Sequence, residues 1–320
     1  MKILVPTSVT LDESRLGLEA EDTVVSYDPT VNIDAEHYDA DVLISWANTN
    51  EQLKDAAAHL EQVELVQSLL AGPDQARAAG FRQEAFITSG IGLHSKTVAE
   101  HALALTLNFV RFLPTLAEHQ DRSNWAGELG GAQELHPADQ VTTLLDAKVT
   151  IWGFGSIGTT TARLFQAFGA QVTGVATTAG EREGFPVIAT EDIDSILPET
   201  DILVMILPNS EATQNALDAA RLAKLPTRAY IINVGRGPTV NEADLVAALN
   251  EGSIAGAGID VAVTEPLPAD NPLWAAKNIV ITPHSAGGRP VDPESLIAQN
   301  LQALRDTRAG KDADWCNKMN

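Results

Sequence analysis

The sequence predicts an α/β fold of two doubly wound parallel-sheet domains, one flavodoxin-like and one of the Rossmann type. Short apolar runs alternate with helical patterns along the chain, which is typical of parallel α/β proteins. The 320 residues exceed the size at which a single hydrophobic core stops growing. A glycine-rich turn near the middle opens a second series of alternating elements. We expect one domain to comprise residues 1–94 and 289–320, and the other to comprise residues 95–288.

The first domain is expected to contain five strands with helices between them. The short apolar runs that mark the strands are Lys2–Val5, Val24–Tyr27, Val42–Trp46, Val63–Ser68 and Ala85–Thr88. Helical spacing predicts helices near Leu11–Leu18, Asn50–Leu60 and Pro73–Ala79, and a last helix at Pro293–Thr307 that returns to this domain.

A different kind of segment follows. Thr97–Leu113 is apolar on nearly all faces, which predicts a buried helix between the two domains. Residues 119–146 are polar and glycine-containing, with Trp125 isolated among them. We expect an extended arm there that contacts a second copy of the chain in a homodimer.

The second domain repeats the alternation. Its expected strands are Lys148–Trp152, Val172–Val175, Ile202–Ile206, Ala229–Asn233, Gly256–Val261 and Asn278–Ile281. Its expected helices are Ile157–Ala167, Glu191–Ile196, Thr213–Leu217 and Glu242–Asn250.

Charge and cysteine content exclude several classes of function. The 43 acidic and 21 basic residues give a net charge of −22, which disfavours nucleic acids and anionic membranes as partners. The one cysteine, Cys316, permits neither an intrachain disulfide nor a cysteine metal cluster, and no other metal site is expected. The apolar run Ile3–Val5 is too short for a signal peptide, and no segment reaches the length of a membrane span. We therefore expect a cytoplasmic protein.

The glycine-rich turn predicts a dinucleotide site. Gly153, Gly155 and Gly158 form the pattern GxGxxG between a strand and a helix, and they enclose Ser156 and Ile157. In such a turn the first glycine permits the bend, the second lets the backbone approach a pyrophosphate, and the third allows close helix packing. The N-terminus of the following helix offers N–H groups to the anion. These residues are expected to bind NAD or NADP, which makes residues 95–288 the NAD(P)-binding domain.

The end of the next strand bears on the choice of cofactor. An acidic residue there binds the ribose hydroxyls of NAD, but this sequence has Ala176-Thr177-Thr178. Thr177 and Thr178 would not repel a 2′-phosphate, and Arg182 follows shortly. The sequence therefore favours NADP slightly and leaves NAD open.

Arg236, Glu265 and His284 each come shortly after a predicted strand of the second domain. Ligands bind at the carboxyl ends of parallel strands, so the three residues are expected to lie along one cleft. A guanidinium can bind a carboxylate with two parallel hydrogen bonds, and a histidine titrates near neutral pH. A carboxylate beside a histidine favours its charged form. This set suits the protonation of a carbonyl oxygen next to a carboxylate.

The motifs together resemble the D-isomer-specific 2-hydroxyacid dehydrogenases. The resemblance extends over nearly the whole chain, from Ser68–Gly72 through Val98–His101 to His284. It implies an oxidoreductase that transfers hydride between NAD(P)H and a small 2-keto acid or D-2-hydroxy acid. In that role Arg236 anchors the substrate, and His284, paired with Glu265, donates the proton.

The resemblance also implies further binding residues. The backbone around Ala71, Gly72 and Pro73 should bind the substrate carboxylate, which makes residues 1–94 with 289–320 the substrate (catalytic) domain. The further cofactor contacts expected are Leu207, Pro208, Thr213, Val234, Gly235, Asp260 and Gly287.

Other interpretations are open for these residues. Taken singly, Arg236 suits a surface ion pair, Glu265 a turn, and His284 a buried structural position, although together they favour catalysis. Trp46 could line a substrate pocket or pack in the core. One rival function is a dinucleotide-binding regulatory protein similar to corepressors, but binding alone needs no general acid. A formate dehydrogenase is another, but its substrate has no hydroxyl proton for a Glu–His pair to manage.

Overall fold

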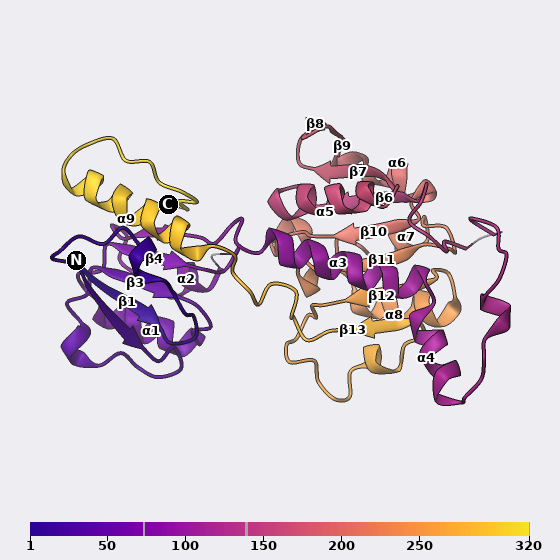
Figure 1. The fold of residues 1–320 in the computed structure, drawn as a ribbon, viewed down its shortest axis with the longest axis horizontal. Helices are drawn as coiled ribbons and strands as arrows, with labels where there is room; N and C mark the ends of the chain where they lie inside the picture. The colour runs from indigo at the N-terminus through magenta and orange to yellow at the C-terminus, as the bar shows by residue number, and fades with distance from the viewer. Residues whose placement is uncertain (73, 138–139, 320) are drawn as a thin grey trace. The chain divides into compact units, whose positions relative to one another are not determined.

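The computed structural model describes residues 1–72, 74–137 and 140–319 (Figure 1). The chain divides into two compact units, Met1–His94 with Arg289–Asn320 and Ser95–Gly288. Each unit is an α/β structure around its own sheet, which confirms the predicted fold class.

Unit 1 contains a five-stranded parallel sheet in the order β2-β1-β3-β4-β5, which is the flavodoxin-like order. Its strands are β1 Lys2–Pro6, β2 Thr23–Tyr27, β3 Val42–Ser45, β4 Leu65–Ser68 and β5 Phe86–Thr88. Its α-helices are α1 Asn50–His59, α2 Asp74–Ala78 and α9 Pro293–Arg308. The interior strands β3 and β4 are buried throughout, because helices cover both faces of the sheet.

Alternate residues of the strands supply two separate cores in unit 1. Leu43 packs in the core that includes Leu53 of α1, whereas Ile44 packs in the core that includes Leu301 of α9. Successive strand side chains point to opposite faces, so α1 and α9 cover opposite sides of this sheet (Figure 1).

The C-terminal tail covers the edge strand β5. Thr88 and Lys318 form an antiparallel bridge, and the backbone N–H of Met319 donates to the carbonyl of Ile87 at 2.9 Å. A covered edge offers no free strand for pairing with another chain.

Unit 2 contains an eight-stranded sheet in the order β13-β12-β11-β10-β6-β7-β9-β8. All neighbours are parallel except β8, which runs antiparallel to β9. The strands are β6 Lys148–Trp152, β7 Gln171–Ala176, β8 Gly180–Arg182, β9 Phe185–Ala189, β10 Ile202–Met205, β11 Tyr230–Asn233, β12 Gly256–Ile259 and β13 Ile279–Ile281. The α-helices are α3 Ser95–Val110, α4 Leu113–Asp121, α5 Ser156–Ala167, α6 Ile193–Ile196, α7 Ala219–Leu222 and α8 Glu242–Glu251.

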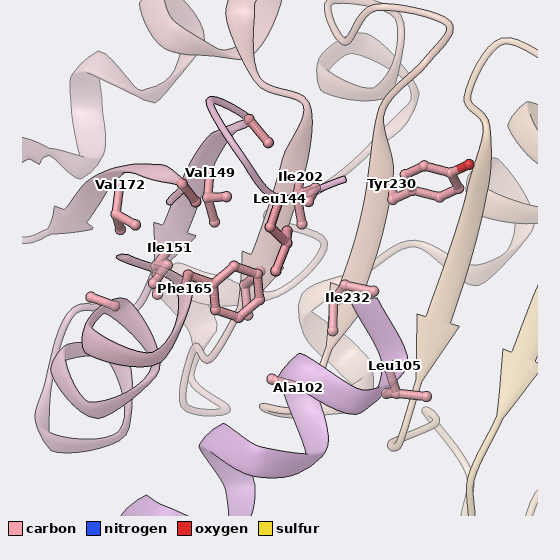
Figure 2. Close-up of a cluster of buried hydrophobic side chains, with 14 of the residues drawn as sticks. Ala102, Leu105, Leu144, Val149, Ile151, Phe165, Val172, Ile202, Tyr230 and Ile232 are labelled. Atoms are coloured by element: carbon pink, nitrogen blue, oxygen red, sulfur yellow. The ribbon is translucent and has the colours of Figure 1, made fainter. Parts of the chain in front are cut away.

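Two cores again flank the sheet of unit 2. One face packs against α3 and α5, and the other packs against α6, α7 and α8. Figure 2 shows the first core, where side chains of several strands meet those of the two helices; it includes Val149, Ile151, Ile202, Ile232, Phe165, Ala102 and Leu105. A Cβ atom on Gly258 of β12 would lie 3.1 Å from the Cβ of Leu105, so α3 approaches this strand closely.

Several local predictions were wrong. Leu11–Leu18 is not an α-helix: it holds a short 3-10 helix, Glu13–Arg15, capped by Asp12, and Gly17 has a φ of +64° that a helix does not allow. The helix expected at Thr213–Leu217 is a 3-10 turn, Glu211–Thr213, and α7 begins only after Asp218, whose side chain caps it. The hairpin of β8 and β9 and the helix α4 were missed. Pro73, the expected start of a helix, lies outside the described residues.

The remaining 3-10 helices are short: Ala35–His37, Gly127–Leu129, Thr190–Asp192, Leu197–Glu199, Gly237–Thr239 and Pro272–Ala275. Within the part of the chain that the structure describes, no helix combines the length and apolarity needed to cross a membrane.

Candidate active site

The glycine-rich turn joins β6 to α5. Gly153 has a φ of +106°, and a Cβ there would lie 2.5 Å from the carbonyl oxygen of Ile206. A Cβ on Gly158 would lie 2.5 Å from the carbonyl oxygen of Gly153. Gly155, the N-cap residue of α5, faces open space and provides no side-chain cap for the helix. The first and third glycines are thus required by the fold, while the second leaves helix N–H groups accessible to an anion.

The two residues between Gly155 and Gly158 have different surroundings. Ser156 is exposed, and its hydroxyl lies 2.8 Å from that of Ser95 at the start of α3. Ile157 is half-buried and packs against the core beneath α3 and α5. The side chain of Ile157 therefore supports the loop from below, and Ser156 lies at its surface.

Arg182 lies beside the same turn. The hairpin of β8 and β9 turns the chain back, so the Arg182 guanidinium donates to the carbonyl oxygen of Phe154 at 2.9 Å and to that of Thr178 at 3.4 Å. Thr177 and Thr178 are exposed just after the end of β7. The arrangement brings a cation and two hydroxyl-bearing residues together beside the glycine-rich turn.

The other expected cofactor residues follow the carboxyl ends of the next strands. Leu207 and Pro208 follow β10, and the Thr213 hydroxyl donates to the carbonyl of Pro208 at 2.6 Å. Val234 and Gly235 follow β11, and a Cβ on Gly235 would lie 2.8 Å from the backbone nitrogen of Leu207. These two loops therefore contact each other at one edge of the sheet. Gly287 follows β13, beyond the turn that carries His284.

Arg236 lies in the turn after β11, and its backbone is fixed by two polar side chains. Asn233 accepts from the backbone N–H of Gly235 at 3.1 Å and donates to the carbonyl of Arg236 at 3.3 Å. The Thr239 hydroxyl donates to the same carbonyl at 2.6 Å. The half-buried Arg236 guanidinium donates to the carbonyl of Gly235 at 2.8 Å. Such a guanidinium can offer its other N–H groups to a carboxylate.

Glu265 and His284 form a hydrogen-bonded pair. The Nδ1 atom of His284 lies 2.7 Å from Oε2 of Glu265, and Oε1 of Glu265 accepts from the backbone N–H of Ala262 at 2.9 Å. The His284 side chain is 46% exposed and the Glu265 side chain is 37% exposed. A carboxylate only accepts, so Nδ1 carries the proton and Nε2 is left to exchange one with a ligand.

The turn that carries His284 is built around Asp260, at the end of β12. The backbone N–H of His284 donates to the Asp260 carbonyl at 2.8 Å. The carboxylate accepts from the backbone N–H groups of Ser285 at 2.9 Å and Ala286 at 3.0 Å, and from the Thr282 hydroxyl at 2.6 Å. His284 itself has a φ of +51°, a conformation that costs energy outside glycine and is held by these contacts.

His101 of α3 extends this network. Its Nε2 atom lies 2.9 Å from the Thr282 hydroxyl and 3.4 Å from Oδ1 of Asp260. Burial by itself raises the pKa of Asp260, but hydrogen bonds from His101, Thr282 and the backbone of the turn outweigh it and lower the pKa to about 2. Asp260 is therefore ionised, and its charge organises the turn. Sequence reasoning missed this role of His101, because the two bonded residues lie 181 positions apart.

A pocket of about 640 Å³ lies beside the Glu265–His284 pair within unit 2. Its walls include Trp274 and Thr282 in addition to Asp260. The volume falls in the range of small-molecule sites. The pair therefore faces a space that a metabolite-sized ligand can enter.

The remaining expected substrate residues belong to unit 1. Ala71 and Gly72 are half-buried in the loop after β4, and Pro73 lies outside the described residues. The backbone N–H of Leu70 donates to the Ser68 hydroxyl at 3.2 Å, which holds the start of this loop.

Comparison with known proteins agrees with this architecture. Residues 103–286, more than half of the chain, match the family model of the D-isomer-specific 2-hydroxyacid dehydrogenase, NAD-binding domain. A putative 2-hydroxyacid dehydrogenase of Haemophilus influenzae is 32% identical over 67% of this chain and 68% of its own length. A hydroxypyruvate reductase of Blautia hydrogenotrophica is 27% identical over 99% of this chain and its full length. The crystal structure of a D-isomer-specific 2-hydroxyacid dehydrogenase from Xanthobacter autotrophicus, in complex with NADPH and MES, is 28% identical with a TM-score of 0.76, covering 100% of this chain and 97% of that one.

Proposed function

The chain belongs to the D-isomer-specific 2-hydroxyacid dehydrogenases, a family of NAD(P)-dependent enzymes, and we propose that it reduces a small 2-keto acid to the D-2-hydroxy acid. The observation that carries the proposal is the 2.7 Å contact between His284 and Glu265. In this proposal, unit 2 binds the cofactor and unit 1 supplies the remaining substrate contacts. The accessible N-terminus of α5 fits the cofactor's pyrophosphate.

In the proposed mechanism each residue has one task. When bound, the cofactor would be the hydride source for reduction of the carbonyl carbon of the keto acid. Arg236 binds the substrate carboxylate and polarises the carbonyl oxygen. His284 Nε2 gives its proton to that oxygen as the new C–H bond forms, and Glu265 stabilises the positive charge on the imidazole beforehand. The products are the 2-hydroxy acid, the oxidised cofactor and a neutral imidazole, which takes up a proton from solvent.

Substrate binding is proposed to use two groups of contacts. One is the backbone of Ala71, Gly72 and Pro73, and the other is the guanidinium of Arg236. Asp260 is proposed to act mainly through the His284 turn, because both of its carboxylate oxygens already accept from that turn.

For the cofactor we propose a preference for NADPH. The end of β7 carries Thr177 and Thr178 where an NAD-binding strand carries an acidic residue, and Arg182 lies beside it. The test is the ratio of kcat/KM for NADPH to that for NADH. Arg182→Gln should lower this ratio about tenfold or more, because the variant loses a charge-assisted hydrogen bond to the 2′-phosphate. Arg163→Gln is the control, because Arg163 pairs with Glu183 of the same hairpin and not with the loop.

The activity test is a panel of 2-keto acids, among them glyoxylate, hydroxypyruvate, pyruvate and bulkier examples, followed at 340 nm. His284→Ala should lower kcat by about 10²–10⁴-fold while cofactor affinity stays nearly constant. His59→Ala, at an exposed histidine of unit 1, is the control and should retain full activity. Tight cofactor binding without turnover of any keto acid would favour the regulatory rival, and oxidation of formate would favour a formate dehydrogenase.

We also propose that the protein is a cytoplasmic homodimer. A single cysteine suits a reducing compartment. The arm of residues 119–146 carries Trp125, which is 93% exposed, and neighbouring α4 exposes Leu113 and Leu116. Light scattering tests the dimer, and Trp125→Ser should weaken it; a monomeric wild-type protein would refute this part of the proposal.

A further inference from the structure

The segment after β5 packs directly against the loop after β4, within unit 1. The backbone N–H of Gly90 donates to the Leu70 carbonyl at 2.7 Å. A Cβ on Gly90 would lie 2.2 Å from the carbonyl oxygen of Leu69, a distance that only glycine allows. The same segment is tied to the returning chain, because the backbone N–H of Val291 donates to the Leu93 carbonyl at 2.8 Å. The loop that precedes Ala71 and Gly72 is thus held against the last residues before α3.

His94, at the end of this segment, is hydrogen-bonded to the loop. Its Nε2 atom lies 2.8 Å from the carbonyl oxygen of Leu69, and the side chain is only 4% exposed. A carbonyl only accepts, so Nε2 carries a proton and donates it. Burial lowers the pKa of His94, which keeps the ring neutral and its tautomer defined by this bond.

Trp46 holds the ring of His94 in place. The two rings are stacked, with centroids 5.2 Å apart and planes inclined by 13°. Trp46 follows β3, and its backbone N–H donates to the side chain of Asn48 at 2.8 Å. The next residue, Ala47, has a φ of +58°, an unfavourable conformation for alanine. This strained residue lies in the turn that directs Trp46 towards His94.

We propose that His94 is a positioning residue, which fixes the loop Leu69–Gly72 through the Leu69 carbonyl with Trp46 as its support. This inference rests on the proposed function, in which the backbone at Ala71 and Gly72 binds the substrate carboxylate. A buried carbonyl beyond the end of a strand needs a donor, and an imidazole supplies one that a core leucine or phenylalanine would not. Substrate binding should therefore depend on His94, whereas the chemical step and cofactor binding should not.

The test compares His94→Leu with His94→Gln. Leucine fills the space without a donor, while the glutamine amide reaches about as far as Nε2 and can restore the bond. His94→Leu should raise KM for the best keto acid about tenfold, with kcat and the Kd for NADPH changed by less than about twofold, because a neutral hydrogen bond contributes up to about 1.5 kcal/mol. His94→Gln should recover most of the wild-type KM.

His59 provides a matched control in the same unit. It also stacks on an aromatic ring, Tyr38, at 4.8 Å and 13°, and it bonds a backbone carbonyl, that of Asp55, at 2.9 Å, but it is exposed on α1. His59→Leu should leave KM unchanged. If His94→Leu does not fold, His94→Asn replaces it, since the shorter amide cannot reach Leu69.

Hydrogen exchange gives a second measurement that needs no activity. Peptides covering residues 65–72 and 86–92 should exchange faster in His94→Leu than in the wild type, and at the wild-type rate in His94→Gln. Unchanged exchange and unchanged KM in the leucine variant would overturn the inference, as would a glutamine variant as impaired as leucine. A wild-type protein inactive on every keto acid would instead refute the proposed function, and the exchange result would still decide the role of His94 in the loop.

Discussion

The Asp260 carboxylate offers a quantitative test of how the His284 turn is held. Its pKa is lowered from an ordinary 3.8 to about 2 by the hydrogen bonds that outweigh its burial. At 1.36 kcal/mol per pKa unit, the ionised group contributes about 2 kcal/mol to the free energy of unfolding at neutral pH. The substitution Asp260→Asn removes the charge while keeping the size of the side chain, and should therefore cost about that amount.

The sign of the pH dependence follows from the lowered pKa. Because the folded state holds the carboxyl ionised at a lower pH than the unfolded state, the contribution is complete above about pH 5 and lost as the pH falls through about 2. Urea unfolding at intervals from pH 7 to pH 3 measures this contribution to the free energy of unfolding. The free energy of unfolding of the wild type should exceed that of Asp260→Asn by about 2 kcal/mol at pH 7 and by about half of that near pH 3.

A control and an activity assay complete this test. Asp270 is exposed in the same unit, so Asp270→Asn should change stability by less than about 0.5 kcal/mol at any pH. Asp260→Asn should also lower kcat, because the side chain keeps only one of the two oxygens that accept from the His284 turn and loses its charge. A difference between wild type and Asp260→Asn that is below about 0.5 kcal/mol, or that is the same at pH 7 and pH 3, would refute the reasoning.

Three further predictions follow from the site and the composition. Glu265→Gln should lower kcat for keto-acid reduction about 10–100-fold through loss of the charged partner of His284, and an unchanged kcat would contradict the pairing. Gly153→Ala should lower the melting temperature, because its Cβ would lie 2.5 Å from a backbone oxygen. Gly155→Ala places its Cβ in open space, so it should weaken NADPH binding and leave the melting temperature unchanged. Equal melting temperatures for the two variants would argue against these different roles of the two glycines. Raising KCl from about 0.1 M to about 1 M, which shortens the Debye length from about 10 Å to about 3 Å, should raise the melting temperature of a protein with a net charge of −22. A constant melting temperature would show that self-repulsion is negligible.

The positions of the main strands could be predicted because buried parallel strands are short continuous apolar runs. Ile202–Met205 is an example, with every residue buried. The expectation that the loops after these strands share one edge of the sheet followed from the same strands, since parallel strands end at a common edge. That rule was sufficient to expect Glu265 and His284 at this edge, and the structure adds that the strands before them, β12 and β13, are paired neighbours.

The elements that could not be predicted depend on contacts between distant parts of the chain. The strand β8 has three residues, begins at Gly180 and is exposed or half-buried, so no hydrophobic periodicity marks it. It is nevertheless the element that carries Arg182 back to the glycine-rich turn. His101 belongs to the segment Val98–His101 that carries the resemblance, but nothing near it in the sequence identifies its partner, and only the packing of α3 brings it to Thr282.

The bonding of the arginines in unit 2 explains how so acidic a protein can attract anionic ligands. Arg163, Arg221 and Arg228 pair with carboxylates, which neutralise much of their charge. The guanidinium groups of Arg182 and Arg236, beside the loops that follow β6, β7 and β11, donate instead to main-chain carbonyl oxygens, which orient a guanidinium but carry no formal charge. Carbonyl partners thus fix these two side chains while leaving their positive charge available. The same edge that collects the expected cofactor and substrate residues therefore retains two oriented cations on a surface that otherwise repels anions.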